Sequence, residues 1–349
     1  MSLTTALRTG DVAELPSRRD EDWRWSDLRG LLRKLPPASP PGDAARLGQG
    51  PFDGLTQDRV VFLNGRRLTG DAALVIDAGA QRTIALRFVS HTSETAHHAA
   101  ITLTLAPGAS AVLLESCEGA GEGYVADVTL DIRLGEGARL ERIVTVDEAA
   151  DAVAVSTTEV DLAPGAVFAQ TVLTRGAKRQ RHETRVHHHG GGADLRLDGI
   201  YLLDGPRHGD LTTAVIHEGL NGATRQLTKG AVRGAARAVF QGRIVVARGA
   251  DRTDARMGHH ALILSERAEV DAKPELEIYA DDVSCAHGNT VGALDEEALF
   301  YARSRGIPEP EARAMLTEAF VAEVVDRIEH AGARDVAASW VTARLRGEP

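Results

Sequence analysis

The sequence predicts a mainly β protein whose strands stack as the coils of a β-solenoid, followed by a C-terminal α-helical domain. Between about residues 59 and 292, short apolar or alternating runs such as 101–105 and 128–134 are bounded by glycine or by charged turns. A Gly-Ala step recurs through this region, and helical periodicity begins after Gly292. With 349 residues and 43% hydrophobic composition, the chain can fill such an elongated core.

The Gly-Ala step supplies the repeat length. Its spacings are 29, 29, 28, 27, 30 and 27 residues, at Gly79, Gly108, Gly137, Gly165, Gly192, Gly222 and Gly249. Each coil of a solenoid covers its apolar face only by stacking on its neighbours, and a recurrent glycine is typical of a recurrent corner. Other Gly-Ala steps, including those at Gly119 and Gly230, fall outside this spacing.

The first part of the chain, residues 1–50, is predicted to be a small helical segment with a proline-rich linker. The linker lies at 35–42, where Pro36, Pro37, Pro40 and Pro41 cannot continue a helix. Residues 51–292 then form the predicted β-helix core.

Residues 293–349 form the predicted C-terminal helical domain. Asp295 is a candidate N-cap, and Gly306 with Pro308 ends that first helix. A second helix begins at about Glu309 and carries an apolar stripe at Ala312, Leu316, Phe320, Val324 and Ile328; a third short helix covers 335–346. We expect the stripe to pack against the end of the solenoid, because an open solenoid end needs a cap.

Composition and missing motifs exclude several classes of protein. Two cysteines, Cys117 and Cys285, make no disulfide framework, and no signal peptide opens the chain, so a reducing cytoplasmic location is expected. No apolar run approaches the roughly 18 residues that span a membrane, and a net charge of −10 opposes nonspecific nucleic-acid binding. No Gly-Lys dipeptide occurs, so the chain has no P-loop for a nucleotide.

The strongest chemical signal is the segment 281–288, which places a cysteine two residues before a histidine in a strand-like stretch. Side chains at i and i+2 of a strand share a face, so Cys285 and His287 emerge together. Thiolate and imidazole are ligands for iron or zinc, but a closed site usually takes about four ligands. The sequence therefore predicts half of a metal site.

The same region resembles a known family. The segments 273–283, 285–288, 294–301 and 303–307 are similar to the SufD-type members of the SufB/SufD family, which belong to the SUF complex for iron-sulfur cluster assembly. Segments 239–246 and 253–256 also fit this family, and 21–28 is a weaker upstream match. The related SufB subunits are expected to be longer and richer in cysteine.

The resemblance implies a right-handed parallel β-helix that acts as a scaffold subunit and not as an enzyme. It implies pairing with a SufB-type subunit, docking of the SufC-type ATPase by residues 293–349, and a transient iron-sulfur cluster shared with the partner. His287 would be the primary ligand and Cys285 a secondary one. Family members often carry Lys and Ser where this chain has Ser284 and Ala286, positions that face away from the pair. Whether the isolated chain forms a homodimer stays open.

Two other functions are compatible with a β-helix. A β-helical carbohydrate-active enzyme would need paired carboxylates and aromatic sugar platforms, and an aromatic content of 4% disfavours it. A purely structural subunit would dock the ATPase without touching metal.

Other candidate residues are weaker. Cys117 ends an apolar run and is expected to be buried and structural. In the run 187–189, His187 and His189 share a strand face while His188 opposes them, and the neighbouring pairs at 97–98 and 259–260 also point to opposite faces.

Overall fold

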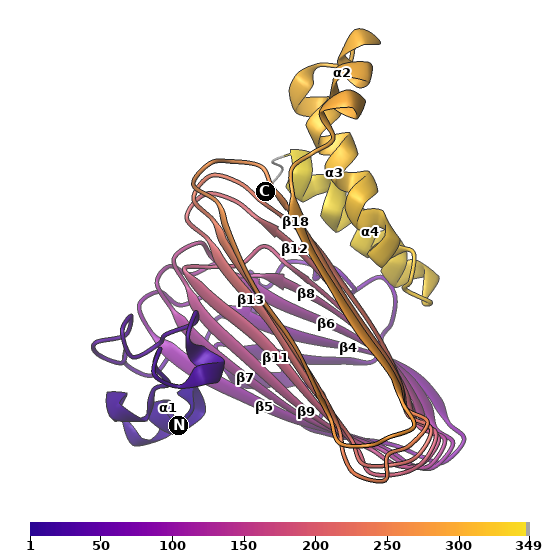
Figure 1. Ribbon diagram of the computed structural model, residues 1–349. Coiled ribbons are helices and arrows are strands. Elements are labelled where there is room, and N and C mark those ends of the chain that lie inside the picture. Colours follow the sequence, from indigo (N-terminus) through magenta and orange to yellow (C-terminus); the bar gives the residue numbers. More distant parts are fainter. Residues whose placement is uncertain (347–349) are drawn as a thin grey trace.

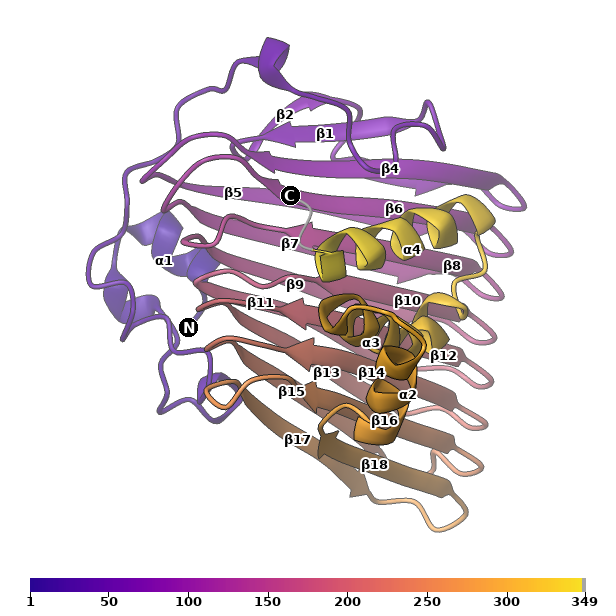
Figure 2. The ribbon, with the colours of Figure 1, turned by 90° about the horizontal axis from the view of Figure 1, so that it is seen from above.

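The protein, described here by a computed structural model for residues 1–346, is a parallel β-solenoid with a helical arm on one side and an N-terminal segment on the other (Figures 1 and 2). Its coils form a ten-stranded and an eight-stranded sheet that face each other. From β5 to β16 each coil adds one strand to each sheet, so a strand pairs with the strands two before and two after it in sequence. This confirms the predicted parallel β-helix with C-terminal helices.

The strands and helices have the following bounds. The ten-stranded sheet contains, in spatial order, β18 (Ser284–Gly292), β16 (Asp254–Ile263), β14 (Ala223–Val232), β12 (Asp194–Leu203), β10 (Val167–Thr174), β8 (Arg139–Asp147), β6 (Ser110–Gly119), β4 (Gln81–Ser90), β1 (Arg59–Leu63) and β2 (Arg66–Thr69). The eight-stranded sheet contains β17 (Glu269–Ile278), β15 (Arg237–Val246), β13 (His208–His217), β11 (Arg179–His188), β9 (Val153–Leu162), β7 (Val125–Leu134), β5 (Ala96–Leu105) and β3 (Ala73–Ile76). The helices are α1 (Leu3–Thr9), α2 (Glu296–Ser304), α3 (Glu309–Val325) and α4 (Ala331–Arg346).

The recurrent Gly-Ala step marks one corner of the solenoid, where the chain passes from the eight-stranded to the ten-stranded sheet. Six of its seven glycines have φ between 64° and 81°, a left-handed conformation that most side chains disfavour. The seventh, Gly222, is the exception, because Asn221 takes the left-handed conformation there with φ of 57°. Asparagine tolerates this region better than most residues, so the corner is kept with a shift of one position.

The interior between the sheets is mostly apolar but includes a buried ion pair. Arg142 on β8 donates from Nε and Nη2 to Oε2 of Glu115 on β6, at 2.9 and 2.7 Å, and from Nη1 to Gln170 at 2.6 Å. Both charged side chains are fully buried. Breaking such a pair leaves an uncompensated charge, which typically costs about 3–5 kcal/mol.

The helical arm packs along the outer face of the ten-stranded sheet, so the expectation that its apolar stripe covers the end of the solenoid is wrong. Val324 and Ile328 contact a patch of outward leucines and isoleucines, among them Ile143, Ile200 and Leu227. The outer face of β8 to β14 has apolar side chains where an outward face would ordinarily be polar, and this extra apolar surface is what the arm buries. Among the described residues, no helix is both long and apolar enough to cross a membrane.

Helix α4 begins four residues earlier than the predicted position 335 because a distant strand caps it. The carboxylate of Glu141 on β8 accepts hydrogen bonds from the backbone N–H groups of Glu329 and His330 at 2.7 and 3.0 Å. Helix α2 has the predicted cap, since Asp295 accepts from the N–H groups of Glu297 and Ala298. The last three residues of the predicted domain 293–349 lie outside the described residues.

The N-terminal segment lies on the outer face of the eight-stranded sheet, opposite the arm (Figure 2). Ser26 donates to the buried carboxylate of Asp210 on β13, and the indole of Trp23 covers the guanidinium of Arg181 at 4.4 Å. The proline-rich linker follows, running beside β5 through a bridge between Ala38 and Ala96. The segment therefore covers polar side chains that would otherwise face solvent.

Candidate metal centre

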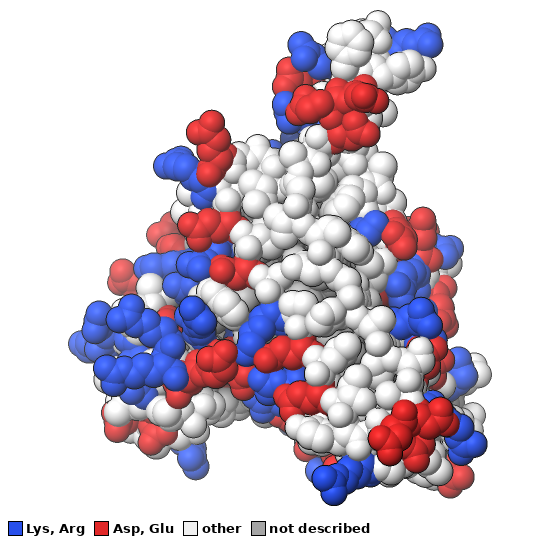
Figure 3. Space-filling view, in the orientation of Figure 1, with Lys and Arg blue, Asp and Glu red and all other residues white. Residues whose placement is uncertain are grey.

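The last coil of the solenoid, β17 and β18, has no coil stacked on it. In the described residues β18 pairs only with β16, and β17 only with β15, so each strand presents one unpaired edge. Apolar side chains are exposed here at Ile278, Tyr279 and Val291. This end faces the viewer in Figure 1, and Figure 3 shows a broad band of uncharged atoms across it with charged side chains along the sides.

Cys285 and His287 lie on the interior face of this last coil. In the parallel register between β16 and β18, Cys285 stands beside Ala255 and His287 beside Met257. Ala255 and Met257 are buried in the solenoid core, so the same alternation directs both candidate ligands toward the axis of the solenoid. Cys285 is partly buried against that core, whereas His287 is exposed because no further coil covers it.

The pair offers one sulfur and one nitrogen ligand, and no more. Burial raises the pKa of the Cys285 thiol, and the nearby carboxylate of Asp254 acts in the same direction, so the free chain keeps this thiol protonated at neutral pH. A metal ion would have to displace that proton. Within the described part of the chain, no three His, Cys, Asp or Glu side chains gather closely enough to hold a metal ion.

Sequence reasoning missed a third residue on the same face, Asn289. It follows His287 by two positions, so the alternation that pairs Cys285 with His287 was also the signal for Asn289. Its side-chain oxygen lies 2.7 Å from Nδ1 of His259, the residue beside it on β16. The last coil thus presents cysteine, histidine and asparagine in a row along its interior face.

His259 lies beside this row, whereas Cys117 and the histidines 187–189 lie away from it. Cys117 is buried in the interior, and burial raises the pKa of its thiol well above the ordinary value, which suits a structural role. His188 is buried and shares a hydrogen bond of 3.0 Å with His217 of the next coil. His187 and His189 lie on the outer face with their rings stacked, and His189 pairs with Glu218 at 2.6 Å.

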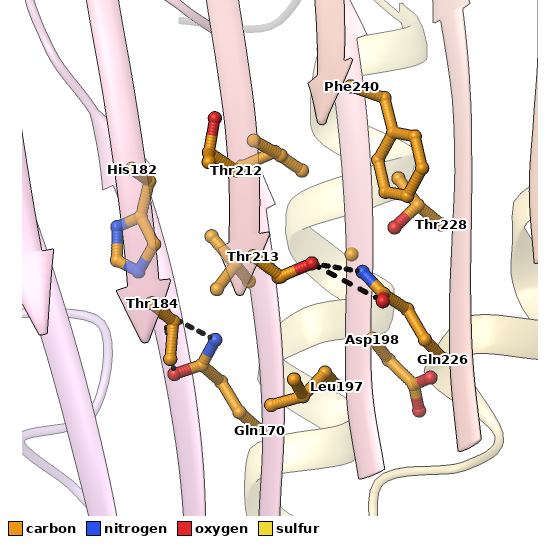
Figure 4. A pocket seen from close by; sticks show the side chains of 13 residues that line it. Gln170, His182, Thr184, Leu197, Asp198, Thr212, Thr213, Gln226, Thr228 and Phe240 are labelled. Carbon is orange, nitrogen blue, oxygen red and sulfur yellow. Dashed lines mark hydrogen bonds between the residues drawn. The ribbon is translucent and has the colours of Figure 1, made fainter. Parts of the chain in front are cut away.

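The solenoid interior also contains a small cavity, lined by apolar side chains together with glutamine and threonine. It has a volume of about 20 Å³, room for about one water molecule. Figure 4 shows that Gln170 bonds Thr184 across the cavity and that Gln226 bonds Thr213. His182, at its edge, has both ring nitrogens buried without a partner in the described residues. The size suits ordered water and excludes an organic ligand.

A wider groove of about 780 Å³ lies between the arm and the solenoid. Arginines outnumber acids on its walls; they include Arg175 and Arg233 from the solenoid and Arg313 from α3. Several of these charges are paired, as Arg233 is with Asp204 at 3.3 Å.

Comparison with known proteins gives the following similarities. Residues 88–320 match the family model described as "SUF system FeS cluster assembly, SufBD core domain". The chain is 30% identical to "Iron-sulfur cluster assembly protein SufD" of Escherichia coli (strain K12), over 99% of this chain and 92% of that protein. It is 28% identical to "Iron-sulfur cluster assembly SufBD family protein Rv1462" of Mycobacterium tuberculosis, over 91% and 86% of the two chains. It is 33% identical to the SufD of Bacillus subtilis (strain 168), over 39% and 31%.

Proposed function

The chain belongs to the SufD family of the SUF system for iron-sulfur cluster assembly, and from this membership we propose that it is a scaffold subunit whose last coil holds part of the assembly site. His287 gives an imidazole nitrogen to iron, or orients a thiolate of the partner, and Cys285 assists. A SufB-type subunit completes the site, and a SufC-type ATPase docks on the arm. The chain itself binds no nucleotide.

One observation carries this proposal: the two ligand-type residues lie on the interior face of a terminal coil, on which no further coil of the described residues stacks. A metal-binding pair on a closed coil would be sealed inside the core, and a pair on the outer face would be open to water. At an uncovered end, a second subunit that stacks on the coil encloses the pair and adds its own ligands. The iron-sulfur cluster is then the cargo of the complex.

The edges of the last coil support pairing with a second solenoid. Both sheets end here with unpaired strands, which readily add a strand from another chain. The exposed apolar residues Ile278, Tyr279 and Val291 lie beside these edges, with Tyr279 57% exposed. A partner coil would pair the backbone edges and bury these side chains together.

The arm supports a second contact, with the ATPase. Phe300 and Tyr301 on α2 are 72% and 60% exposed, and Met315 on α3 is 49% exposed. Helix α2 stands out from the solenoid in Figure 1, so these side chains are accessible to a large partner. Aromatic residues of this kind often dominate the binding energy of protein interfaces.

The deciding experiment compares His287→Ala with the parent chain, each co-expressed with the SufB-type and ATPase subunits and isolated without oxygen. Iron and acid-labile sulfide are measured per complex, together with subunit stoichiometry. We expect iron to fall roughly tenfold with stoichiometry unchanged, because the ligand is lost while the interface remains. The matched control is His187→Ala, a histidine on the outer face of β11.

Unchanged iron in an intact His287→Ala complex would contradict the proposal. The chain would then be a structural subunit that docks its partners without touching metal. Loss of the SufB-type subunit from the variant complex would instead show that His287 stabilises the interface.

A further inference from the structure

A chain of hydrogen bonds runs inside the solenoid and ends at the last coil. The hydroxyl of Tyr201 on β12 lies 2.9 Å from Nε2 of His259 on β16, and Nδ1 of His259 lies 2.7 Å from Oδ1 of Asn289 on β18. Tyr201 reaches His259 by passing over Gly230 of the intervening coil, where a Cβ atom would lie 2.1 Å from its ring. Phe240 stacks on the imidazole at 4.5 Å with an interplanar angle of 4°, which fixes the ring plane.

The direction of these bonds follows from burial. Tyr201 and His259 are fully buried, and burial lowers the pKa of His259 to about 4, so the imidazole is neutral. Its two nitrogens then have opposite roles, one donor and one acceptor. The buried Tyr201 hydroxyl has no other acceptor among the described residues, so it donates to Nε2 of His259. Nδ1–H must then donate to Asn289, which fixes the carboxamide with its oxygen toward the core.

This arrangement leaves the amide N–H groups of Asn289 for the candidate site. They have no hydrogen-bond partner within residues 1–346, and Asn289 lies on the same strand face as His287, about 7 Å along the strand. A subunit that covers the last coil would remove these donors from water, and a buried amide requires an acceptor. Anionic sulfur, as thiolate or sulfide, is the acceptor that a nascent iron-sulfur cluster supplies, and such bonds stabilise clusters.

We propose that Asn289 is a further binding residue of the assembly site, donating from its amide nitrogen to a sulfur of the cluster, and that His259 and Tyr201 are the positioning residues that orient it. This rests on the proposed function in placing the cluster at the last coil. The bond chain itself exists in the isolated protein and is testable there.

The test uses Asn289→Asp and Tyr201→Phe in the co-expressed complex. Aspartate still accepts a hydrogen bond from Nδ1–H of His259 but has no amide N–H to donate. The variant therefore distinguishes the bond to His259 in the core from the bond to sulfur of the cluster. Phenylalanine removes the hydroxyl, which lets His259 change tautomer and Asn289 turn its oxygen outward. We expect both variants to lose cluster iron to an iron(II) chelator roughly tenfold faster than the parent, with subunit stoichiometry unchanged. Tyr124→Phe, which removes a buried tyrosine hydroxyl elsewhere, is the control.

A second measurement is independent of the cluster. In the isolated chain with ¹⁵N-labelled histidine, the parent His259 should carry its proton on Nδ1, and Tyr201→Phe should move that proton to Nε2.

The outcomes separate the two proposals. If His287→Ala loses iron while Asn289→Asp and Tyr201→Phe release it at the parent rate, the role of Asn289 is refuted and the assembly site stands. If Asn289→Asp accelerates iron release while His287→Ala keeps its iron, Asn289 stands and the role of His287 is refuted. A parent His259 protonated on Nε2 would refute the positioning chain directly.

Discussion

Burial lowers the pKa of several histidines in the folded protein, among them His182, His208, His217 and His259. Burial lowers the pKa of the last three from 6.5 to about 4, and that of His182 well below 6.5. The unfolded chain takes up protons on these residues below pH 6.5 and the folded chain does not. Their contribution to stability is therefore complete above pH 6.5 and is lost as the pH falls toward 4.

Two buried acids act in the opposite direction. Burial raises the pKa of Glu148 and of Asp198 to about 7, so both keep a proton in the folded state that the unfolded state releases above about pH 4.5. They offset part of the histidine effect. The net expectation is a loss of about 1–3 kcal/mol of unfolding free energy per pH unit between pH 6 and 5.

Urea unfolding of the isolated chain at pH 7, 6 and 5 measures this loss. A His217→Gln variant should show a shallower pH dependence than the parent, and His187→Gln, altered on the outer face, should not. A parent stability that stays constant from pH 6 to 5 would show that the buried histidines accept protons without disrupting the core.

At the scale of the elements, the arm is fixed to the solenoid by charges as well as by its apolar face. Lys229 on β14 pairs with Glu323 on α3 at 2.6 Å. Asp147 on β8 accepts from the indole of Trp340 at 2.7 Å. The arm thus spans the strands from β8 to β14, and α2 projects beyond them as an accessible element.

Replacing Phe300 and Tyr301 together by alanine should weaken binding of the ATPase subunit at least about tenfold, because two exposed aromatic anchors are lost while the arm keeps its packing. Titration of the ATPase onto the isolated chain measures this. Val75→Ala on β3 removes a side chain that is 60% exposed at the other end of the solenoid and is the control. Equal affinity of the double variant and the parent would place the ATPase contact elsewhere on the chain.

The elements also show how far sequence reasoning reached. The coil length followed from the spacing of the corner glycines, and the shared face of Cys285 and His287 followed from strand alternation, because both are local properties of the chain. Glu141 capping α4 across 188 residues was not predictable, since no local pattern shows which strand lies beneath the arm. The bond from Tyr201 to His259 spans 58 residues and depends on the stacking register of three coils.

At the scale of the whole molecule, the two ends of the solenoid differ. At the N-terminal end, β2 closes the ten-stranded sheet as an antiparallel hairpin with β1. At the C-terminal end, β17 and β18 stop with free edges, and the arm lies on the side of the solenoid and leaves them uncovered. A stack in which each coil contacts only its neighbours is least stable at an uncovered end.

Amide hydrogen exchange of the isolated chain should therefore be faster in β17 and β18 than in the central strands β9 to β12. Adding the SufB-type subunit should slow exchange in β17 and β18 at least about tenfold, because their free N–H groups become paired. The central strands are the internal control and should not change. Protection that appears at β1 and β2 instead would show that the partner binds the other end.

The unpaired edges of β17 and β18 together determine how precisely a second subunit can be positioned on the last coil. A strand that pairs with β18 alone can slide by two residues and still present the same faces. A partner coil that pairs with both β17 and β18 cannot shift its register in this way. Its two strands are joined by a turn of fixed length, so neither strand can slide along its sheet without moving the other. A partner that pairs with both strands would therefore be held in a single register, with its ligand opposite His287.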